Sequence, residues 1–132
     1  MLFVETTEDN ISPNVGEGNL ISTPADAARW MRTLISGQGA LTKAQIVRMT
    51  LVPAGNPSYA LGLVVAGTGI GHNGAHPGYL NIVVYNPADD VAAVVLLSYT
   101  DFSDLTKPTP MMVDIITEAR RIAGYTAIFP TQ

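Results

Sequence analysis

The sequence contains no cysteine among its 132 residues, and this absence excludes several kinds of chemistry. Without cysteine the chain forms no disulfide, offers no thiol nucleophile and has no thiolate ligand for a metal ion. Because no thiol is present to report on it, the redox environment of the protein stays open. Cysteine chemistry is therefore excluded from every function considered for this chain.

Charged residues are also scarce. They make up 14% of the chain, whereas apolar residues make up 47% and the mean hydropathy is positive. So few charges cover little of the surface of a small protein, and we expect some apolar surface to meet a partner. Seven basic and eleven acidic residues give a formal net charge of −4. A chain without a basic excess does not attract phosphates, so we expect neither a nucleic acid nor a membrane surface as partner.

Long apolar runs are missing as well. The longest, Val91 to Leu97, is far shorter than the roughly 20 residues that a membrane-spanning helix needs. The N-terminus begins Met1-Leu2-Phe3-Val4 and continues directly into acidic residues, so it lacks the basic region and long apolar core of a signal peptide. We therefore expect a soluble chain, and the sequence leaves its cellular localisation unknown.

The length and apolar content predict a single domain over residues 1–132. The stretch 1–18 mixes acidic residues, asparagine, proline and two glycines without periodicity, and it is predicted to be a connection. A short strand at Leu2-Phe3-Val4 is the one element expected within it.

Two helices are predicted over residues 23–50. A hydroxyl cap at Thr23, a proline directly after it and an acid at Asp26 mark the start of the first helix. Thr42 and Gln45 have the spacing of a capping box and mark the start of a shorter second helix. The apolar stripe of the first helix consists of Ala27, Met31, Leu34 and Ile35.

An antiparallel meander of three or four strands is predicted over residues 58–99. Its segments, rich in Val, Ile, Leu and Tyr, are Ser58–Ala66, Ile70–Ala75, Leu80–Tyr85 and Val91–Tyr99. The run 91–97 is apolar on both alternating faces, which predicts a strand covered on both sides. A C-terminal helix over 110–124 supplies a cover, with a stripe of Met112, Ile115, Ile116, Ala119, Ile122 and Ala123. The fold class is α+β.

The candidate site lies between the first two strand segments. The twelve residues from Thr68 to Tyr79 contain four glycines and both histidines of the chain. If residues 70–75 are extended, His72 and Gly74 point to the same face, and an imidazole stands beside bare backbone. Exposed amides next to a polar group are useful in acyl transfer, because they stabilise a developing oxyanion.

Two other interpretations of this segment stay open. The glycines can serve tight turns and a bulge, with His72 a half-exposed strand residue. A metal site would pair His72 with His76, but two imidazoles without a third ligand make a poor site, so no metal is expected. The glycines also do not form a dinucleotide fingerprint, and we expect no cofactor.

The sequence Gly71-His72-Asn73-Gly74, followed by Pro77-Gly78-Tyr79, resembles a motif of the serine β-lactamase family in its broad sense. That family covers class C β-lactamases, D-alanyl-D-alanine carboxypeptidases, other penicillin-binding-protein-like enzymes and related esterases, and the motif is its Lys-Thr-Gly or His-x-Gly box on an edge strand. Flanking segments are similar to the family in the same order: 18–30 to its glycine-rich turn into a helix, Ser58–Leu63 to its Tyr-Gly-Leu-Gly strand, and 86–97 to the following hairpin. The resemblance covers residues from about 16 to 124.

The resemblance implies roles for five residues. His72 takes the place of the motif's cationic or hydrogen-bonding side chain, Gly74 keeps the strand open to substrate, and Ala75 offers its backbone N–H as an oxyanion donor. These three are the implied catalytic residues. Asn73 and Tyr79 are the implied substrate-binding residues.

The family's nucleophile has no counterpart here. It is the serine of a Ser-x-x-Lys box, and lysine follows at the third position after none of Ser12, Ser22, Ser36, Ser58, Ser98 and Ser103. The family's second motif, Tyr-x-Asn, precedes the third, whereas Tyr79-Leu80-Asn81 follows it. The resemblance therefore implies the C-terminal portion of an enzyme that acts through an acyl-serine on an amide, lactam or ester, and that is inactive as this chain alone. The alternative is a non-catalytic binding or structural domain derived from the same fold.

The resemblance also implies a partner surface. In the family the last strand pairs on its outer side with strands from the N-terminal part of the chain. Without them, residues 91–97 form an exposed apolar edge, which invites pairing with another chain. We expect a homodimer or a domain swap through this edge, unless the segment Leu2-Phe3-Val4 folds back onto it. The ligand of the parent enzyme is expected to be a small molecule or a peptide.

Overall fold

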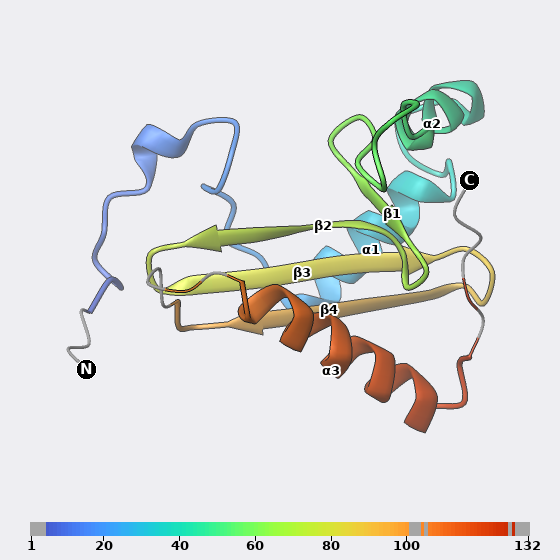
Figure 1. The fold of residues 1–132 in the computed structure, drawn as a ribbon. Coiled ribbons are helices and arrows are strands. Elements are labelled where there is room, and N and C mark those ends of the chain that lie inside the picture. The colour runs from blue at the N-terminus through green and yellow to red at the C-terminus, as the bar shows by residue number, and fades with distance from the viewer. Residues whose placement is uncertain (1–4, 101–103, 105, 127, 129–132) are drawn as a thin grey trace.

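The computed structural model describes residues 5–100, 104, 106–126 and 128, so the strand predicted at positions 2–4 lies outside the described part. Three α-helices and one four-stranded antiparallel sheet form the fold, which confirms the α+β class (Figure 1). The elements are η1 (Ser12–Asn14), α1 (Pro24–Ile35), α2 (Lys43–Thr50), β1 (Val64–Ala66), β2 (Gly69–His76), β3 (Tyr79–Asn86), β4 (Val91–Leu97) and α3 (Pro108–Ile122). Among the described residues, no helix is long and apolar enough to cross a bilayer.

The sheet is a meander with the order β1-β2-β3-β4. The first strand is shorter than the sequence predicts, because regular pairing with β2 begins only at Val64. Gly62 has a φ of +69°, and Tyr59 meets Val64 in a single antiparallel bridge. The segment before β1 therefore turns back on itself instead of extending the strand.

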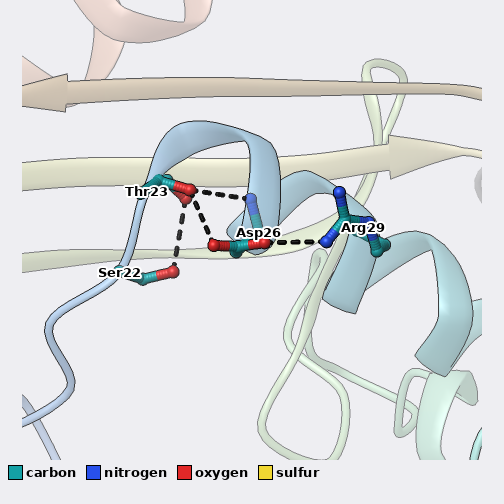
Figure 2. A network of polar contacts seen from close by, with 4 residues as sticks. All are labelled: Ser22, Thr23, Asp26 and Arg29. Atoms are coloured by element: carbon teal, nitrogen blue, oxygen red, sulfur yellow. Dashed lines mark hydrogen bonds and ion pairs between the residues drawn. The ribbon is translucent and has the colours of Figure 1, made fainter.

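The cap network at the start of α1 confirms the predicted helix start (Figure 2). The backbone N–H of Asp26 donates to the Thr23 Oγ1 at 3.1 Å, and the Thr23 hydroxyl donates to the Asp26 Oδ2 at 2.9 Å. The Asp26 Oδ1 accepts from Arg29 at 2.8 Å. These contacts satisfy a backbone donor and place a negative charge at the positive end of the helix dipole.

The two faces of the sheet are covered by different helices. In Figure 1, α1 lies behind the sheet and α3 lies in front of it, and both contact β3 and β4. The core on the α1 side contains Met31, Ile35, Ala60, Leu63, Val65, Ile70 and Tyr85. The core on the α3 side contains Leu80, Ile82, Val84, Met112 and Ile116. Burial of apolar surface on both faces is the main stabilising contribution to this arrangement.

The face that α3 turns to the sheet differs from the predicted stripe. Met112, Ile116 and Arg120 are buried, whereas Ile115 and Ile122 are exposed. Arg120 explains the rotation, because its guanidinium donates to the Thr68 carbonyl at 2.7 Å and forms an ion pair with Asp89. A helix whose inward residues recur every fourth position turns the intervening apolar residues outward.

Strand β4 is covered on both faces, as its sequence predicts. Ala92 packs on the α1 side, and Ala93, Val95 and Leu97 pack on the α3 side. All of β4 except the exposed Leu96 is nevertheless only half-buried. Within the described part of the chain β4 pairs with β3 alone, so its outer edge is unpaired.

Candidate functional site

The predicted site residues lie on β2 and at the start of β3. His72 is opposite Val83 and Gly74 is opposite Asn81, so both side-chain positions point to the α1 side, as strand alternation predicts. Asn73 and Ala75 point to the α3 side. The side chains of residues 72–75 thus lie on both faces of the sheet. What these residues have in common is the outer edge of β2.

That edge is open over the site. β1 pairs with β2 only at residues 69–71, so in the described part of the chain no strand pairs with residues 72–76 on the side away from β3. In an antiparallel pair each residue's peptide groups either bond the partner strand or point away from it, in alternation. The phase of this alternation decides which peptide groups the edge presents.

Two hydrogen bonds of the loop before β1 fix the phase: Ala60 N–H to Leu63 O at 2.7 Å and Val65 N–H to Ser58 O at 2.8 Å. These bonds direct the peptide groups of Leu63 and Val65, on either side of Val64, away from β2. The N–H and C=O of Val64 itself therefore point towards its partner Gly71. The peptide groups of Gly71 therefore point away from β3. By the same alternation, those of Asn73 and Ala75 also point away from β3, towards the open edge.

The hairpin that joins β2 to β3 gives the same phase. Pro77 and Gly78 form a two-residue turn between the paired residues His76 and Tyr79, and Gly78 has a φ of +80°. The pair that closes a two-residue hairpin exchanges its hydrogen bonds. Its neighbour Ala75 must then direct its N–H and C=O outward. Both ends of β2 thus place the Ala75 peptide group at the open edge.

Gly71 and Gly74 of the motif have different structural surroundings. A Cβ on Gly71 would lie 1.9 Å from the Val83 carbonyl oxygen, so this glycine is required by the close approach of two strands. A Cβ on Gly74 would lie 2.8 Å from the Asn81 side-chain nitrogen, which can move. The purely structural interpretation therefore accounts for Gly71 but leaves Gly74 beside a flexible polar side chain.

His72 has protein partners at both ring nitrogens. Its Nδ1 lies 2.5 Å from the Asn73 carbonyl oxygen, and its Nε2 lies 3.0 Å from the Tyr59 hydroxyl. The two rings meet edge to face, with centroids 5.6 Å apart and an interplanar angle of 78°. Tyr59 is not among the site residues that the sequence predicts. The available signal was its place in the segment similar to the family's Tyr-Gly-Leu-Gly strand.

Asn73 and Tyr79 occupy different surroundings. The Asn73 side chain donates to the Thr109 hydroxyl at 3.4 Å and so connects β2 to the first turn of α3. Tyr79 is 46% exposed at the far end of the hairpin, opposite His76. The structure brings neither side chain into contact with His72.

The N-terminal segment reaches the same hairpin. The Asn14 side-chain amide lies 2.8 Å from the His76 Nε2, and the His76 ring packs against Gly18. Two histidines four residues apart on a strand are separated by roughly 13 Å at about 3.3 Å per residue, too far to share a metal ion. Among the described residues no group of three or more His, Asp and Glu side chains could hold a metal ion.

Comparisons with known proteins identify the family. No curated protein and no solved structure gave a match to this chain. A family model described as Beta-lactamase matches residues 3–111, which covers β1 to β4 and both helices before them. The match spans most of the chain and includes the His-x-Gly segment on the open edge of β2. The chain therefore belongs to the β-lactamase family.

Proposed function

We propose that this chain supplies the oxyanion-binding edge of a serine hydrolase that acts on an amide, a lactam or an ester. The observation that carries the proposal is the orientation of the Ala75 peptide group, whose N–H points to the unpaired edge of β2. Family membership supports the reaction class. Gly74, which precedes the donor, leaves the edge accessible to an acyl group.

The proposed reaction requires such a hydrogen-bond donor. When a serine attacks a carbonyl carbon, the carbonyl oxygen becomes an oxyanion, and a preorganised N–H stabilises it more than it stabilises the substrate. Removing one donor of this kind costs about 10²–10³ in rate. Ala75 would provide one N–H of this kind.

The nucleophile lies outside these 132 residues. No serine here is followed by lysine at the third position, and a serine hydroxyl without an adjacent base is a weak nucleophile. We expect the chain alone to perform no covalent turnover, and the complete site to require a polypeptide that carries Ser-x-x-Lys.

Two measurements test this function. Intact-mass spectrometry after incubation with benzylpenicillin and p-nitrophenyl acetate should find no acyl-serine, whereas a stoichiometric adduct on any serine would contradict the missing nucleophile. Amide NMR should show that non-reactive acyl ligands shift the Ala75 resonance more than those of β4. An Ala75→Pro variant, which lacks the N–H, is the matched control for loss of binding.

A non-catalytic binding or structural domain is the second candidate. Gly71 favours it, because the close contact with Val83 gives that glycine a purely structural reason. The NMR measurement separates the candidates: a structural domain leaves the Ala75 amide unmoved by acyl ligands. Reading the DNA in frame before Met1 separates them independently, because Ser-x-x-Lys and Tyr-x-Asn motifs there indicate the enzyme.

We also propose that two copies of the chain pair through β4, as a homodimer or a domain swap. The edge from Val91 to Leu97 carries no charged residue and no proline. Natural edge strands use charge, proline or a bulge to prevent pairing with another chain. An uncharged seven-residue edge covered on both faces lacks the first two of these protections and offers unpaired backbone groups to a second β4.

A further inference from the structure

The hydrogen bonds around His72 determine which of its nitrogens carries the proton. A carbonyl oxygen only accepts, so the contact of Nδ1 with the Asn73 carbonyl at 2.5 Å requires a proton on Nδ1. In the neutral ring Nε2 is then the acceptor, and the Tyr59 hydroxyl, 3.0 Å away, donates to it. Neither nitrogen of the neutral ring is left to bind a ligand.

Tyr59 keeps binding capacity that His72 lacks. Its hydroxyl uses one proton on Nε2, and its oxygen retains lone pairs that accept hydrogen bonds. The residue is 44% exposed, and its ring stands edge-on to the imidazole beside the point where β1 stops covering β2. The side-chain atom available at this end of the open edge is therefore an acceptor on Tyr59.

We propose that Tyr59 is the side chain that meets the ligand here, that His72 is a positioning residue behind it, and that the site favours carbonyl ligands carrying an N–H over their ester counterparts. This inference rests on the proposed oxyanion edge. An amide ligand can place its carbonyl at the Ala75 N–H and donate its own N–H to the Tyr59 oxygen. An ester has no donor, and it gains a bond to Tyr59 only by taking the hydroxyl proton from His72.

The amide is expected to bind more tightly than the ester by the contribution of one hydrogen bond. A net contribution of about 0.5–1.5 kcal/mol corresponds to roughly two- to tenfold in dissociation constant. A matched pair of probes differs at one position, by N–H against O: N-methylacetamide and methyl acetate. The wild-type chain should bind the amide roughly two- to tenfold more tightly, as followed by titration of the Ala75 amide shift.

Tyr59→Phe should abolish this preference, and Tyr125→Phe should retain it. Tyr125 is 44% exposed, as Tyr59 is, and it follows α3 outside the proposed site, so it is a matched control. Equal binding of both probes by the wild type, or an unchanged preference in Tyr59→Phe, overturns the role of Tyr59. If neither probe shifts the Ala75 backbone amide resonance, both the proposed oxyanion edge and the proposed role of Tyr59 are overturned.

The tautomer of His72 gives a readout that needs no ligand. Long-range ¹H–¹⁵N correlations of the imidazole at pH 8 should show the proton on Nδ1 in the wild type and in Tyr125→Phe. Tyr59→Phe should move the population towards the Nε2–H form. A wild-type ring protonated at Nε2 contradicts the arrangement. Unchanged amide resonances of Met112 and Ile116 establish that each variant is folded.

Discussion

The two edges of the sheet differ in almost every physical respect. The edge at β2 is rich in glycine and polar groups, and its side-chain donors and acceptors have specific partners, such as Tyr59 for His72 and Thr109 for Asn73. The edge at β4 is apolar along its whole length and has no pairing partner in the described part of the chain. The first edge carries the proposed site for a small polar group, and the second carries the backbone groups that we propose pair with another strand.

Arg120 links the turn before β2 to the turn before β4, and its loss should give the largest effect. It is 7% exposed and bonds the Thr68 carbonyl beside β2 as well as Asp89, 11% exposed, beside β4. Arg120→Ala leaves the Asp89 carboxylate buried without its ion-pair partner, which typically costs about 3–5 kcal/mol. Denaturant unfolding should show this loss in the free energy of unfolding. Arg121→Ala, which removes an exposed pair with Glu118, should cost under about 1 kcal/mol; equal losses contradict the buried link.

Gly71 tests whether the β2 edge depends on close strand approach. In Gly71→Ala the new methyl group meets the Val83 carbonyl oxygen, so β2 and β3 must separate, and overpacking of this kind costs about 1–3 kcal/mol. Thermal unfolding should show a lower midpoint. Gly39→Ala is the control, because its Cβ would make only ordinary contacts with Thr33. A Gly71→Ala variant as stable as the control would show that the strands are not closely held.

Much of the fold could be predicted because its signals are local. The caps at Thr23 and Thr42 lie within three residues of the groups they bind. The face of α3 could not be predicted, because it depends on a contact between Arg120 and Asp89, 31 residues away. Apolar periodicity alone favours burial of Ile115, whereas the distant ion pair places Arg120 on the inward face with Met112 and Ile116.

In the candidate site, too, the local features could be predicted from the sequence and the long-range contacts could not. The cluster of glycines and histidines marks β2 from the sequence, because such a concentration is local. The partners of its side chains come from elsewhere: Tyr59 is 13 residues before His72, and Asn14 is 62 residues before His76. Their contacts depend on a turn-back before β1 and on the path of the N-terminal segment, neither of which has a pattern in the sequence.

The β4 edge is tested by placing a charge on it. Leu96 is 43% exposed, so Leu96→Lys puts a charge on the edge with little loss of core packing, and it should weaken β4 pairing about tenfold, or about 1.4 kcal/mol. Light scattering after size exclusion at several concentrations measures the shift from dimer to monomer. Leu61→Lys, at a site 72% exposed before β1, should leave the dimer intact. A wild-type chain that stays monomeric at high concentration would remove the proposed pairing.

The turn beside β4 should give the smallest effect, and it depends on pH. Asp90 ends this turn with a φ of 56°, and its Oδ1 accepts from Arg32 at 2.7 Å and from the Tyr85 hydroxyl at 2.9 Å. These two donors, the guanidinium first, hold the pKa of Asp90 below its ordinary value. A carboxyl whose pKa is lower in the folded state stabilises the fold above its unfolded pKa of about 3.9, and this contribution is lost as the pH falls through the folded value.

Asp90→Asn should therefore lower stability slightly at pH 7 and reduce the further loss on acidification below about pH 4. Asparagine tolerates the left-handed backbone at this position, so the change mainly removes the charge. Urea unfolding at pH 7, 4 and 3 measures the difference, with the exposed Glu8→Gln as control. Because Asp90 and Arg32 are exposed, solvent screens their pair and the effect is small. A variant with the same acid sensitivity as the wild type would mean that the Arg32 contact holds the turn beside β4 only weakly, and that β4 is positioned by its packing against α1 and α3 alone.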